Sequence, residues 1–174
     1  VSLDDLRHFR QLDSRTPGHP EFGHTPGVET TTGPLGQGFA NGVGMGLAAR
    51  LARSRFARDG AGPGRHFVYA IAGDGDLMEG VSAEAGSLAG HLGLGNLIYL
   101  YDDNKVQIDG PTTLAFTEDV AKRFEAYHWQ VIGPIDGMNA DEVESAIRRA
   151  QAEKSKPSLI ICRTTIGYGS PAEG

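Results

Sequence analysis

Four short apolar segments, separated by segments with helical periodicity, constrain the fold of this chain more than any other feature. We expect strands at residues 67–72, 96–101, 129–132 and 158–163. The segments between them place apolar residues at helical spacing, and we expect helices at residues 80–92, 117–128 and 140–153. Strands that alternate with crossover helices predict an α/β fold, in which a parallel sheet is covered by helices on both faces in three layers.

The segment before this alternation has a different character. Residues 2–12 are a candidate for a short amphipathic helix, with Leu3, Leu6 and Phe9 as its apolar positions. Residues 13–34 carry so many prolines and glycines that we expect a loop without regular structure. A loop of this length inside a compact domain is unusual, and such loops are often functional.

A glycine-rich segment follows the loop and is predicted to form a helix over residues 36–58. Gly38, Gly42 and Gly46 recur every four residues, so one face of this helix has no side chains. Each glycine costs up to about 1 kcal/mol in a helix interior. We therefore expect another backbone or a ligand to pack closely on that face, and helix packing is favoured over direct contact with a cofactor. Residues 59–65 are expected to form a surface loop.

Composition and charge limit the class of protein. A chain of 174 residues that is 39% hydrophobic suits one domain with one core. The net charge of −6, without a basic block, argues against nucleic acid as the main partner. No apolar run approaches the length of about 18 residues that a membrane helix needs, so no membrane association is expected. Cys162 is the only cysteine and is expected to be a buried thiol in a cytoplasmic protein.

Polar residues follow the first two strand candidates. Asp74 and Gly75 come after residues 67–72, and Asn104, thirty residues beyond Asp74, comes after residues 96–101. A right-handed crossover places both strand ends at the same edge of the sheet, where ligands bind in such folds. Oxygen atoms of Asp74 and Asn104 can share Mg²⁺, which usually takes one or two carboxylates beside phosphate oxygens. Gly75 has no Cβ, so a phosphate can approach its backbone.

The neutral amide at Asn104 suits a site beside a diphosphate. A second carboxylate would repel the diphosphate by about 4 kcal/mol at about 4 Å and an effective dielectric constant of about 20. Taken one at a time, Asp74 and Asn104 are more typical of turns, and only their spacing together with the other motifs of the chain favours a metal site. We expect Asp76 and Asp102 to be solvated or capping residues and to take no part in the site.

Other ligand-binding patterns do not fit this sequence. The dinucleotide-binding spacing of glycines after a strand would need glycine at position 78, where Met78 stands. The phosphate-binding loop of nucleotide triphosphatases is absent because no Gly-Lys-Ser or Gly-Lys-Thr occurs. One cysteine and no histidine pair at helical spacing make a zinc site improbable.

Several longer stretches resemble the transketolase family. "GDGDLMEG" and "YDDNKVQIDG" match the thiamine diphosphate signature, in which an asparagine follows GDG by about thirty residues. The segments "TPGHPEFGHTPGVETTTGPLGQG", "SLAGHLGLGNLI", "DVAKRFEAYHW" and "TTIGYGS" are similar to transketolases over nearly the whole chain. Dihydroxyacetone synthase shares much of this pattern and remains an alternative within the enzymes.

The resemblance implies an activity and a cofactor. Transketolases transfer a two-carbon ketol group from a ketose phosphate to an aldose phosphate, in the pentose phosphate pathway, with thiamine diphosphate and Mg²⁺ or Ca²⁺. Matching family positions imply that the metal is bound by Asp74, Asn104 and the main-chain carbonyl of Val106. They imply that the cofactor contacts Gly33, Leu35, Gly75, Asn104, Ile108 and Ile166.

The same resemblance implies catalytic positions. His19 matches a histidine that hydrogen-bonds the sugar substrate. Glu79 and Glu84 match buried acids at the family's dimer interface, which are often assigned to a proton relay between two cofactors. A homodimer, or the domains of the family that this stretch does not match, is therefore the expected partner.

The extent of the match sets one further expectation. We expect residues 1–174 to form a single domain that binds thiamine diphosphate and Mg²⁺, without the family's preceding segment, pyrimidine-binding domain and C-terminal domain. The chain alone is then expected not to turn over. The alternative from a different class is a truncated, non-catalytic module that binds the cofactor or a partner.

Overall fold

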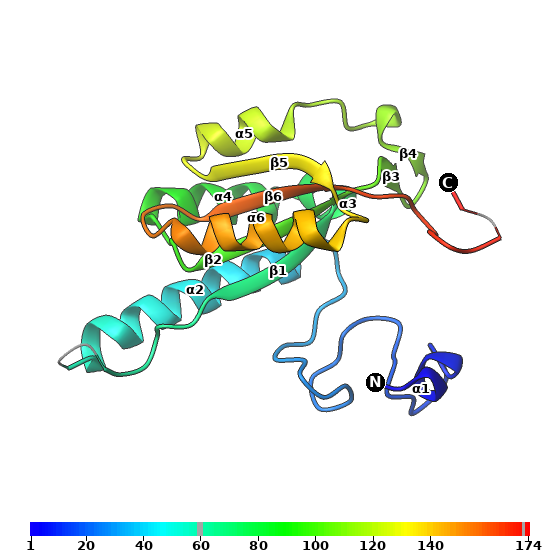
Figure 1. The fold of residues 1–174 in the computed structure, drawn as a ribbon, viewed down its shortest axis with the longest axis horizontal. Coiled ribbons are helices and arrows are strands. Elements are labelled where there is room, and N and C mark those ends of the chain that lie inside the picture. The colour runs from blue at the N-terminus through cyan, green and yellow to red at the C-terminus, as the bar shows by residue number, and fades with distance from the viewer. Residues whose placement is uncertain (59–60, 172) are drawn as a thin grey trace.

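The fold is that of a computed structural model, which describes residues 1–58, 61–171 and 173–174. Its centre is a sheet of four parallel strands in the order β1-β2-β6-β5 (Figure 1). The strands are β1 (Val68–Gly73), β2 (Leu97–Asp103), β5 (Gln130–Asp136) and β6 (Ser158–Arg163). The predicted parallel sheet is therefore confirmed, and β6 begins and ends where the sequence pattern placed it.

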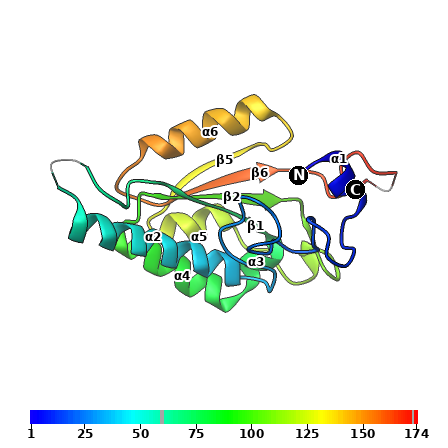
Figure 2. The same ribbon diagram turned by 90° about the horizontal axis from the view of Figure 1, so that it is seen from below.

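Helices cover both faces of this sheet, as Figure 2 shows. One face carries α6 (Ala140–Ala152) over β5 and β6, where Ala146 and Ala150 are buried against Ile132 and Ile160. The other face carries α2, α4 and α5 and holds the larger core cluster, which contains Tyr99. These helices are α2 (Gln37–Phe56), α4 (Gly80–Leu92) and α5 (Val120–Ala126). The three layers of the predicted α/β fold are thus present.

The glycine face of α2 packs directly on β2. A Cβ atom at Gly42 would lie 2.2 Å from the hydroxyl oxygen of Tyr99, and one at Gly46 would lie 2.2 Å from Cδ2 of Leu97. The Tyr99 hydroxyl donates a 2.7 Å hydrogen bond to the main-chain carbonyl of Phe39 in the same helix. Close packing on this face is confirmed, but the neighbours at Gly42 and Gly46 are side chains of β2, where a backbone or a ligand was expected.

The first helix differs from its prediction. The structure forms only α1 (Leu3–Arg7), which buries no residue, and Leu3, Leu6 and Phe9 are exposed by half or more. The pattern of apolar residues was therefore wrong as an indicator of core packing. Local hydrogen bonds account for the helix instead, because Ser2 and Asp5 form a reciprocal capping box at its start.

The remaining predicted helices are present: α4 has the predicted bounds, whereas α2, α5 and α6 are shorter than predicted. Helix α5 begins only after Asp119, whose side chain accepts from the main-chain N–H of Lys122 and fixes the start. Asn139 caps α6 as predicted. In α4 the expected apolar face is only partly correct, because Ala89 is fully buried while Leu88 is 47% exposed. The spacing of apolar residues along a helix does not show which of them another element will cover.

Short elements at the carboxyl end of the sheet were not predicted. They are the five-residue helix α3 (Asp74–Met78), the small antiparallel pair β3 (Val106–Gln107) and β4 (Gly110–Pro111), and the 3₁₀ turn η1 (Thr112–Leu114). The predicted loop over residues 13–34 is confirmed. Part of the loop predicted over residues 59–65 lies outside the described residues. Within the described parts of the chain, no helix is both long and apolar enough to cross a bilayer.

Candidate functional site

A cavity of about 530 Å³ opens at the carboxyl ends of β1 and β2, in the position that the crossover argument predicted. Four separate stretches of the chain form it: the loop before α2, helix α3, the β3–β4 turn, and the segment after β6. We call it the cofactor-side cavity. Its lining residues are Leu35, Gly73, Asp74, Gly75, Asp76, Met78, Glu79, Asn104, Val106, Gln107, Ile108, Asp109 and Ile166.

Most of the residues singled out from the sequence meet in this cavity. All three expected metal ligands line it, as do most of the expected cofactor contacts and one of the expected catalytic acids. Two stretches far apart in sequence, around Leu35 and Ile166, reach it together. The expected site residues that do not line it are Gly33, His19 and Glu84.

The three outlying residues have definite positions. The ring of His19 lies against Gly33, where an added Cβ atom would be 3.0 Å from Cγ of the imidazole. Both residues belong to the loop that leads to Leu35, so they lie near the cavity along the chain but not in its wall. Glu84 is an exposed residue of α4.

Asp74 is the most buried charged group of the cavity, with only 2% of its surface exposed. Its Oδ1 atom accepts a 2.5 Å hydrogen bond from the hydroxyl of Tyr101, and its Oδ2 atom accepts one of 3.1 Å from the main-chain N–H of Lys105. Burial raises the pKa of Asp74 and the nearby carboxylate of Asp103 acts in the same direction, while these two hydrogen bonds lower it. The carboxylate is thus oriented by two neighbours, and no cationic side chain of the described residues forms an ion pair with it.

The main-chain N–H of Lys105 points at Asp74 because Lys105 has an uncommon backbone conformation. Its φ angle is 65°, in the left-handed region that costs a residue with a side chain about 1–3 kcal/mol. The turn brings the N–H onto Asp74, and its carbonyl accepts a 2.9 Å hydrogen bond from Thr112 N–H. Strain of this kind is typical of backbone held for a binding site.

Asn104 lies at the same turn and is fixed by two contacts. Its amide nitrogen donates to Oδ2 of Asp102 at 2.8 Å, and its amide oxygen accepts from the N–H of Val106 at 2.9 Å. Asp102 in turn accepts a hydrogen bond from the hydroxyl of Thr164. The role expected for Asp102 was solvated or capping, and the structure shows instead that it holds the amide of Asn104 in place.

Asp76 also differs from its expected role. Its Oδ2 accepts a 2.8 Å hydrogen bond from Gly73 N–H, which is the expected capping contact at the start of α3. Its Oδ1 accepts a further 2.9 Å hydrogen bond from Gly36 N–H, forty residues away. Asp76 therefore ties the loop that carries Leu35 to the end of β1, and the interpretation that it takes no part in the site was wrong.

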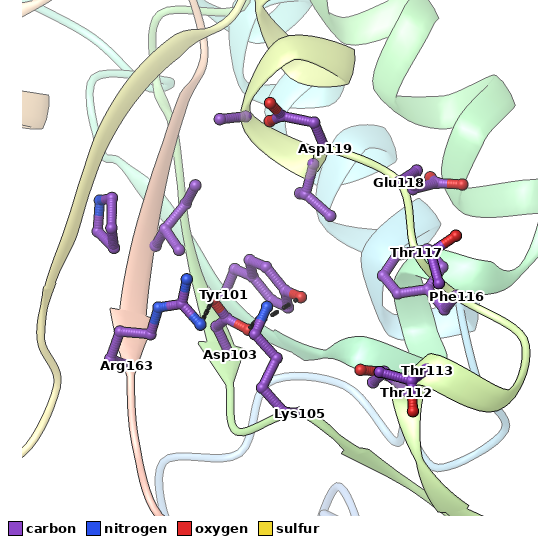
Figure 3. A pocket seen from close by; sticks show the side chains of 14 residues that line it. Tyr101, Asp103, Lys105, Thr112, Thr113, Phe116, Thr117, Glu118, Asp119 and Arg163 are labelled. Carbon is purple, nitrogen blue, oxygen red and sulfur yellow. Dashed lines mark hydrogen bonds and ion pairs between the residues drawn. The ribbon is translucent and has the colours of Figure 1, made fainter.

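Behind this cavity, a second hollow lies between β2, β6 and the start of α5 (Figure 3). There the buried carboxylate of Asp103 accepts from two cations, Lys105 Nζ at 2.7 Å and Arg163 at 3.0 Å. The Asp103 side chain is only 3% exposed, so its charge is neutralised by side chains that reach in from solvent. The pair of cations stabilises the strand end from which Asn104 projects.

The donor set of the cofactor-side cavity fits a hard cation bound together with an anionic ligand. It offers one carboxylate at Asp74, one amide side chain at Asn104 and main-chain groups at Val106. No group of three or more His, Cys, Asp or Glu side chains in the described parts of the chain is arranged to hold a metal. A cation here would need further oxygen ligands, and phosphate groups are the usual source for Mg²⁺.

The opposite wall of the cavity is apolar. Leu35, Met78, Ile108 and Ile166 line it, and each is 37% or more exposed. Gly75 faces this wall, because an added Cβ atom would lie 3.2 Å from Cδ1 of Leu35. A cavity that is polar at one end and apolar at the other suits a ligand that joins a phosphate group to a flat ring.

Some residues of the site were not found from the sequence. Tyr101 was not singled out from the sequence, although its alternation with Asp103 along β2 places both side chains on one face of the strand. Asp76 carried a clearer signal, because an acid three residues after Gly73 can accept a hydrogen bond from the main-chain N–H of Gly73. Gln107 and Asp109 carried no recognisable signal.

Comparisons with known proteins agree on one family. A sequence model described as "Transketolase, thiamine diphosphate binding domain" matches residues 1–174. The chain is 58% identical over 171 residues to a transketolase of Geobacillus stearothermophilus and 60% identical over 171 residues to transketolase 2 of Escherichia coli K12. Each alignment covers 98% of the chain and 26% of the relative, so the chain spans about a quarter of the length of these curated relatives.

Solved structures give the same result for the fold. The chain superposes on transketolase from Leishmania mexicana with a TM-score of 0.90 and 50% identity, over 99% of this chain and 26% of that one. It superposes on a transketolase of Pichia stipitis in complex with sedoheptulose 7-phosphate with a TM-score of 0.86 and 49% identity, again over 99% and 26%.

Proposed function

The chain belongs to the transketolase family, whose thiamine diphosphate-binding domain it contains, and we propose that it forms part of an enzyme that transfers a two-carbon ketol group from a ketose phosphate to an aldose phosphate. The observation that carries the proposal is the cofactor-side cavity. Asp74, Asn104 and Val106 line its polar end, apolar residues that include Leu35 and Ile166 line the other, and Gly75 faces Leu35.

We propose that the polar end binds a divalent cation, Mg²⁺ or Ca²⁺, together with the diphosphate group. Asp74 and Asn104 supply side-chain oxygens and Val106 supplies its carbonyl, while diphosphate oxygens and water complete the coordination. Binding the cation offsets the burial of the Asp74 charge, which forms no ion pair with a cationic side chain in the part of the chain that the structure describes. Gly75 is proposed to contact the diphosphate through its backbone, while a side chain there would meet Leu35 of the apolar wall.

The apolar end is proposed to hold the rings of the cofactor. Leu35, Ile108 and Ile166 contact them and exclude water from the reacting carbon, and Gly33 lies nearby in the loop. When bound, thiamine diphosphate supplies the carbanion chemistry by which the carbon–carbon bond is broken and made. A dry, low-dielectric wall strengthens the electrostatic interactions that stabilise charge at that carbon.

His19, Glu79 and Glu84 are proposed to act on substrate and proton transfer. His19, an exposed residue against Gly33, would hydrogen-bond the hydroxyl groups of the sugar as either donor or acceptor. Glu79 lines the cofactor-side cavity and Glu84 lies on the exposed face of α4, so both can face a second subunit. We propose that in a homodimer they take part in a proton relay between two sites.

The substrates, the metabolic pathway and the cellular location are proposed from family membership. Sugar phosphates are the expected donor and acceptor, since the related Pichia stipitis enzyme was crystallised with sedoheptulose 7-phosphate. A place in the pentose phosphate pathway and a cytoplasmic location follow from the same family membership. The cofactor-side cavity is open at its mouth, and further parts of the enzyme are proposed to close it over the substrate.

Calorimetric titration with thiamine diphosphate tests the proposal. In the presence of Mg²⁺ the complete enzyme should bind the cofactor, and Asp74→Asn should weaken binding by about tenfold or more, because a ligand charge is lost. Asp141→Asn, at an exposed acid of α6 that does not line the cavity, serves as the matched control. Equal affinities for all three proteins would contradict the assignment. A ketol-transfer assay with a ketose phosphate and an aldose phosphate then tests the reaction itself, with formaldehyde as the acceptor that would indicate dihydroxyacetone synthase.

A further inference from the structure

A third cavity, of about 550 Å³, lies at the opposite end of the sheet from the cofactor-side cavity. Phe67, directly before β1, and residues 93–96, directly before β2, form part of its wall. Lys154, between α6 and β6, forms another part. All three precede strands, so the cavity opens at the amino ends of the parallel strands. It shares no lining residue with the cofactor-side cavity.

Every charged side chain that lines this cavity is cationic. Arg50 and Arg53 come from α2, Arg65 from the loop before β1, and Lys154 from the loop after α6. Among the described residues, no Asp or Glu lines the cavity, and none forms an ion pair with any of these four side chains. The chain as a whole has a net charge of −6, so a cavity lined only by positive charges is unusual for this chain. We call this region the basic cavity.

The attraction of a cation to the carboxyl end of a helix can explain three of these side chains individually. Arg50 donates to the carbonyl of Leu92 at the end of α4, Lys154 donates to the carbonyl of Gln151 near the end of α6, and Arg53 lies in the last turn of α2. Such contacts orient the side chains but leave their charges without a counterion. They do not account for Arg65, nor for the convergence of the four on one hollow.

The walls of the basic cavity are closely packed backbone. A Cβ atom at Gly64 would lie 2.0 Å from the carbonyl oxygen of Ala49 in α2, and one at Gly95 would lie 2.2 Å from the carbonyl oxygen of Lys154. The Lys154 ammonium lies 4.6 Å from the centre of the Phe67 ring, which restrains it further. These contacts fix the spacing between α2, the loop before β1 and the loop after α6.

We propose that the basic cavity binds a small anion bearing two or more phosphate groups, at a site separate from the cofactor-side cavity. Arginine guanidinium groups pair with phosphate oxygens through two parallel hydrogen bonds, and three arginines here face one space. The volume suits a small molecule. A nucleic acid would need an extended basic stripe, whereas these cations are confined to one hollow in an acidic chain.

Calorimetry with tripolyphosphate tests this proposal directly. The titration uses the complete enzyme in a buffer that contains EDTA, which removes divalent cations and so prevents metal-dependent binding at the cofactor-side cavity. We expect one binding site, and the double substitution Arg53→Ser with Arg65→Ser should weaken the affinity by about tenfold or more. Arg55→Ser is the matched control, since Arg55 lies in the same last turn of α2 but does not line the cavity. Its affinity should stay within about twofold of the unchanged protein.

Hydrogen–deuterium exchange locates the site independently. Tripolyphosphate should protect peptides that cover residues 61–66 and 93–96, at the amino ends of the strands. Protection at residues 73–79 and 104–109 instead would assign the anion to the cofactor-side cavity and overturn the proposal. Equal loss of affinity in Arg55→Ser and in the double variant would also overturn it, because the attraction would then be diffuse. If circular dichroism shows that the double variant is unfolded, Arg65→Ser alone serves for the same comparison.

Discussion

The hydroxyl of Tyr101 donates a 2.5 Å hydrogen bond to Oδ1 of Asp74, and this contact joins the end of β2 to the first residue of α3. Both side chains are almost completely buried, with 2% of their surface exposed. Burial raises the pKa of Tyr101, and the adjacent Asp74 carboxylate raises it further, so the phenol stays protonated and acts as the donor. The proposed metal ligand is therefore oriented by the neighbouring strand.

Removing this donor should weaken cofactor binding without unfolding the protein. In Tyr101→Phe the Asp74 carboxylate keeps only its contact with Lys105 N–H, and it loses a hydrogen bond that lowers its pKa. We expect the affinity for thiamine diphosphate with Mg²⁺ to fall by about fivefold to thirtyfold, which corresponds to one hydrogen bond to a charged group. Calorimetric titration measures this change.

The control for Tyr101→Phe is Tyr99→Phe on the same strand. The hydroxyl of Tyr99 is equally buried but donates to a helix carbonyl, far from the cavity lining. This variant should lose about 1 kcal/mol of unfolding free energy and keep its cofactor affinity. Identical behaviour of the two variants would show that Tyr101 has only a structural role.

Asp76 should contribute to both stability and binding. Asp76→Ala removes the acceptor of two hydrogen bonds, from Gly73 N–H and Gly36 N–H, and leaves both donors unpaired. We expect the free energy of unfolding to fall by about 2 kcal/mol or more. The loop with Leu35 should then lose its fixed position, which thermal unfolding and cofactor titration together would report. A variant that loses stability but binds the cofactor normally would contradict the link through Gly36.

Three glycines of α2 offer a test of the close packing on the sheet. Gly42→Ala and Gly46→Ala should each destabilise the protein by about 1–3 kcal/mol, because the added methyl group overlaps Tyr99 or Leu97. Gly44→Ala is the matched control, since no atom lies within 4 Å of its Cβ position. That change should stabilise the helix by up to about 1 kcal/mol. Urea unfolding of the three variants measures the difference, and the same sign for all three would contradict the account.

Cys162 should react slowly with thiol reagents while the protein is folded. Burial raises the pKa of its thiol, and the carboxylate of Asp102 acts in the same direction. Near pH 8, a smaller fraction of Cys162 is therefore present as thiolate in the folded protein than in the unfolded chain. The reagent also has little access to the buried sulfur. The rate of alkylation in native buffer should be far below that in denaturant. Comparable rates would place Cys162 outside the core.

Much of the fold could be predicted because the relevant signals are local. The apolar run of β6 and the cap at Asn139 lie within a few residues of the elements that they specify. Asp74 and Asn104 could be paired because parallel strands bring their carboxyl ends to one edge. The exposure of Leu3 and Leu88 could not be predicted, since a periodic pattern does not show whether a neighbour covers it.

The contacts that orient the site were the part that the sequence did not show. Asp76 bonds to Gly36 across forty residues, and Tyr101 bonds to Asp74 across twenty-seven. Such pairs depend on how the loop before α2 lies against α3, which no local pattern specifies. The left-handed backbone at Lys105 is similar, because it is maintained by the contacts of its N–H and carbonyl groups.

The most direct test of the central claim is the position of a divalent cation in a crystal grown with thiamine diphosphate and Mn²⁺. The anomalous signal of Mn²⁺ identifies the ion without reference to the protein density. We predict one peak at the carboxyl ends of β1 and β2, within coordination distance of the Asp74 carboxylate, the Asn104 amide oxygen and the Val106 carbonyl, with the diphosphate completing the coordination. A bound cofactor whose metal lies elsewhere, or a peak without contact to Asp74, would contradict the account.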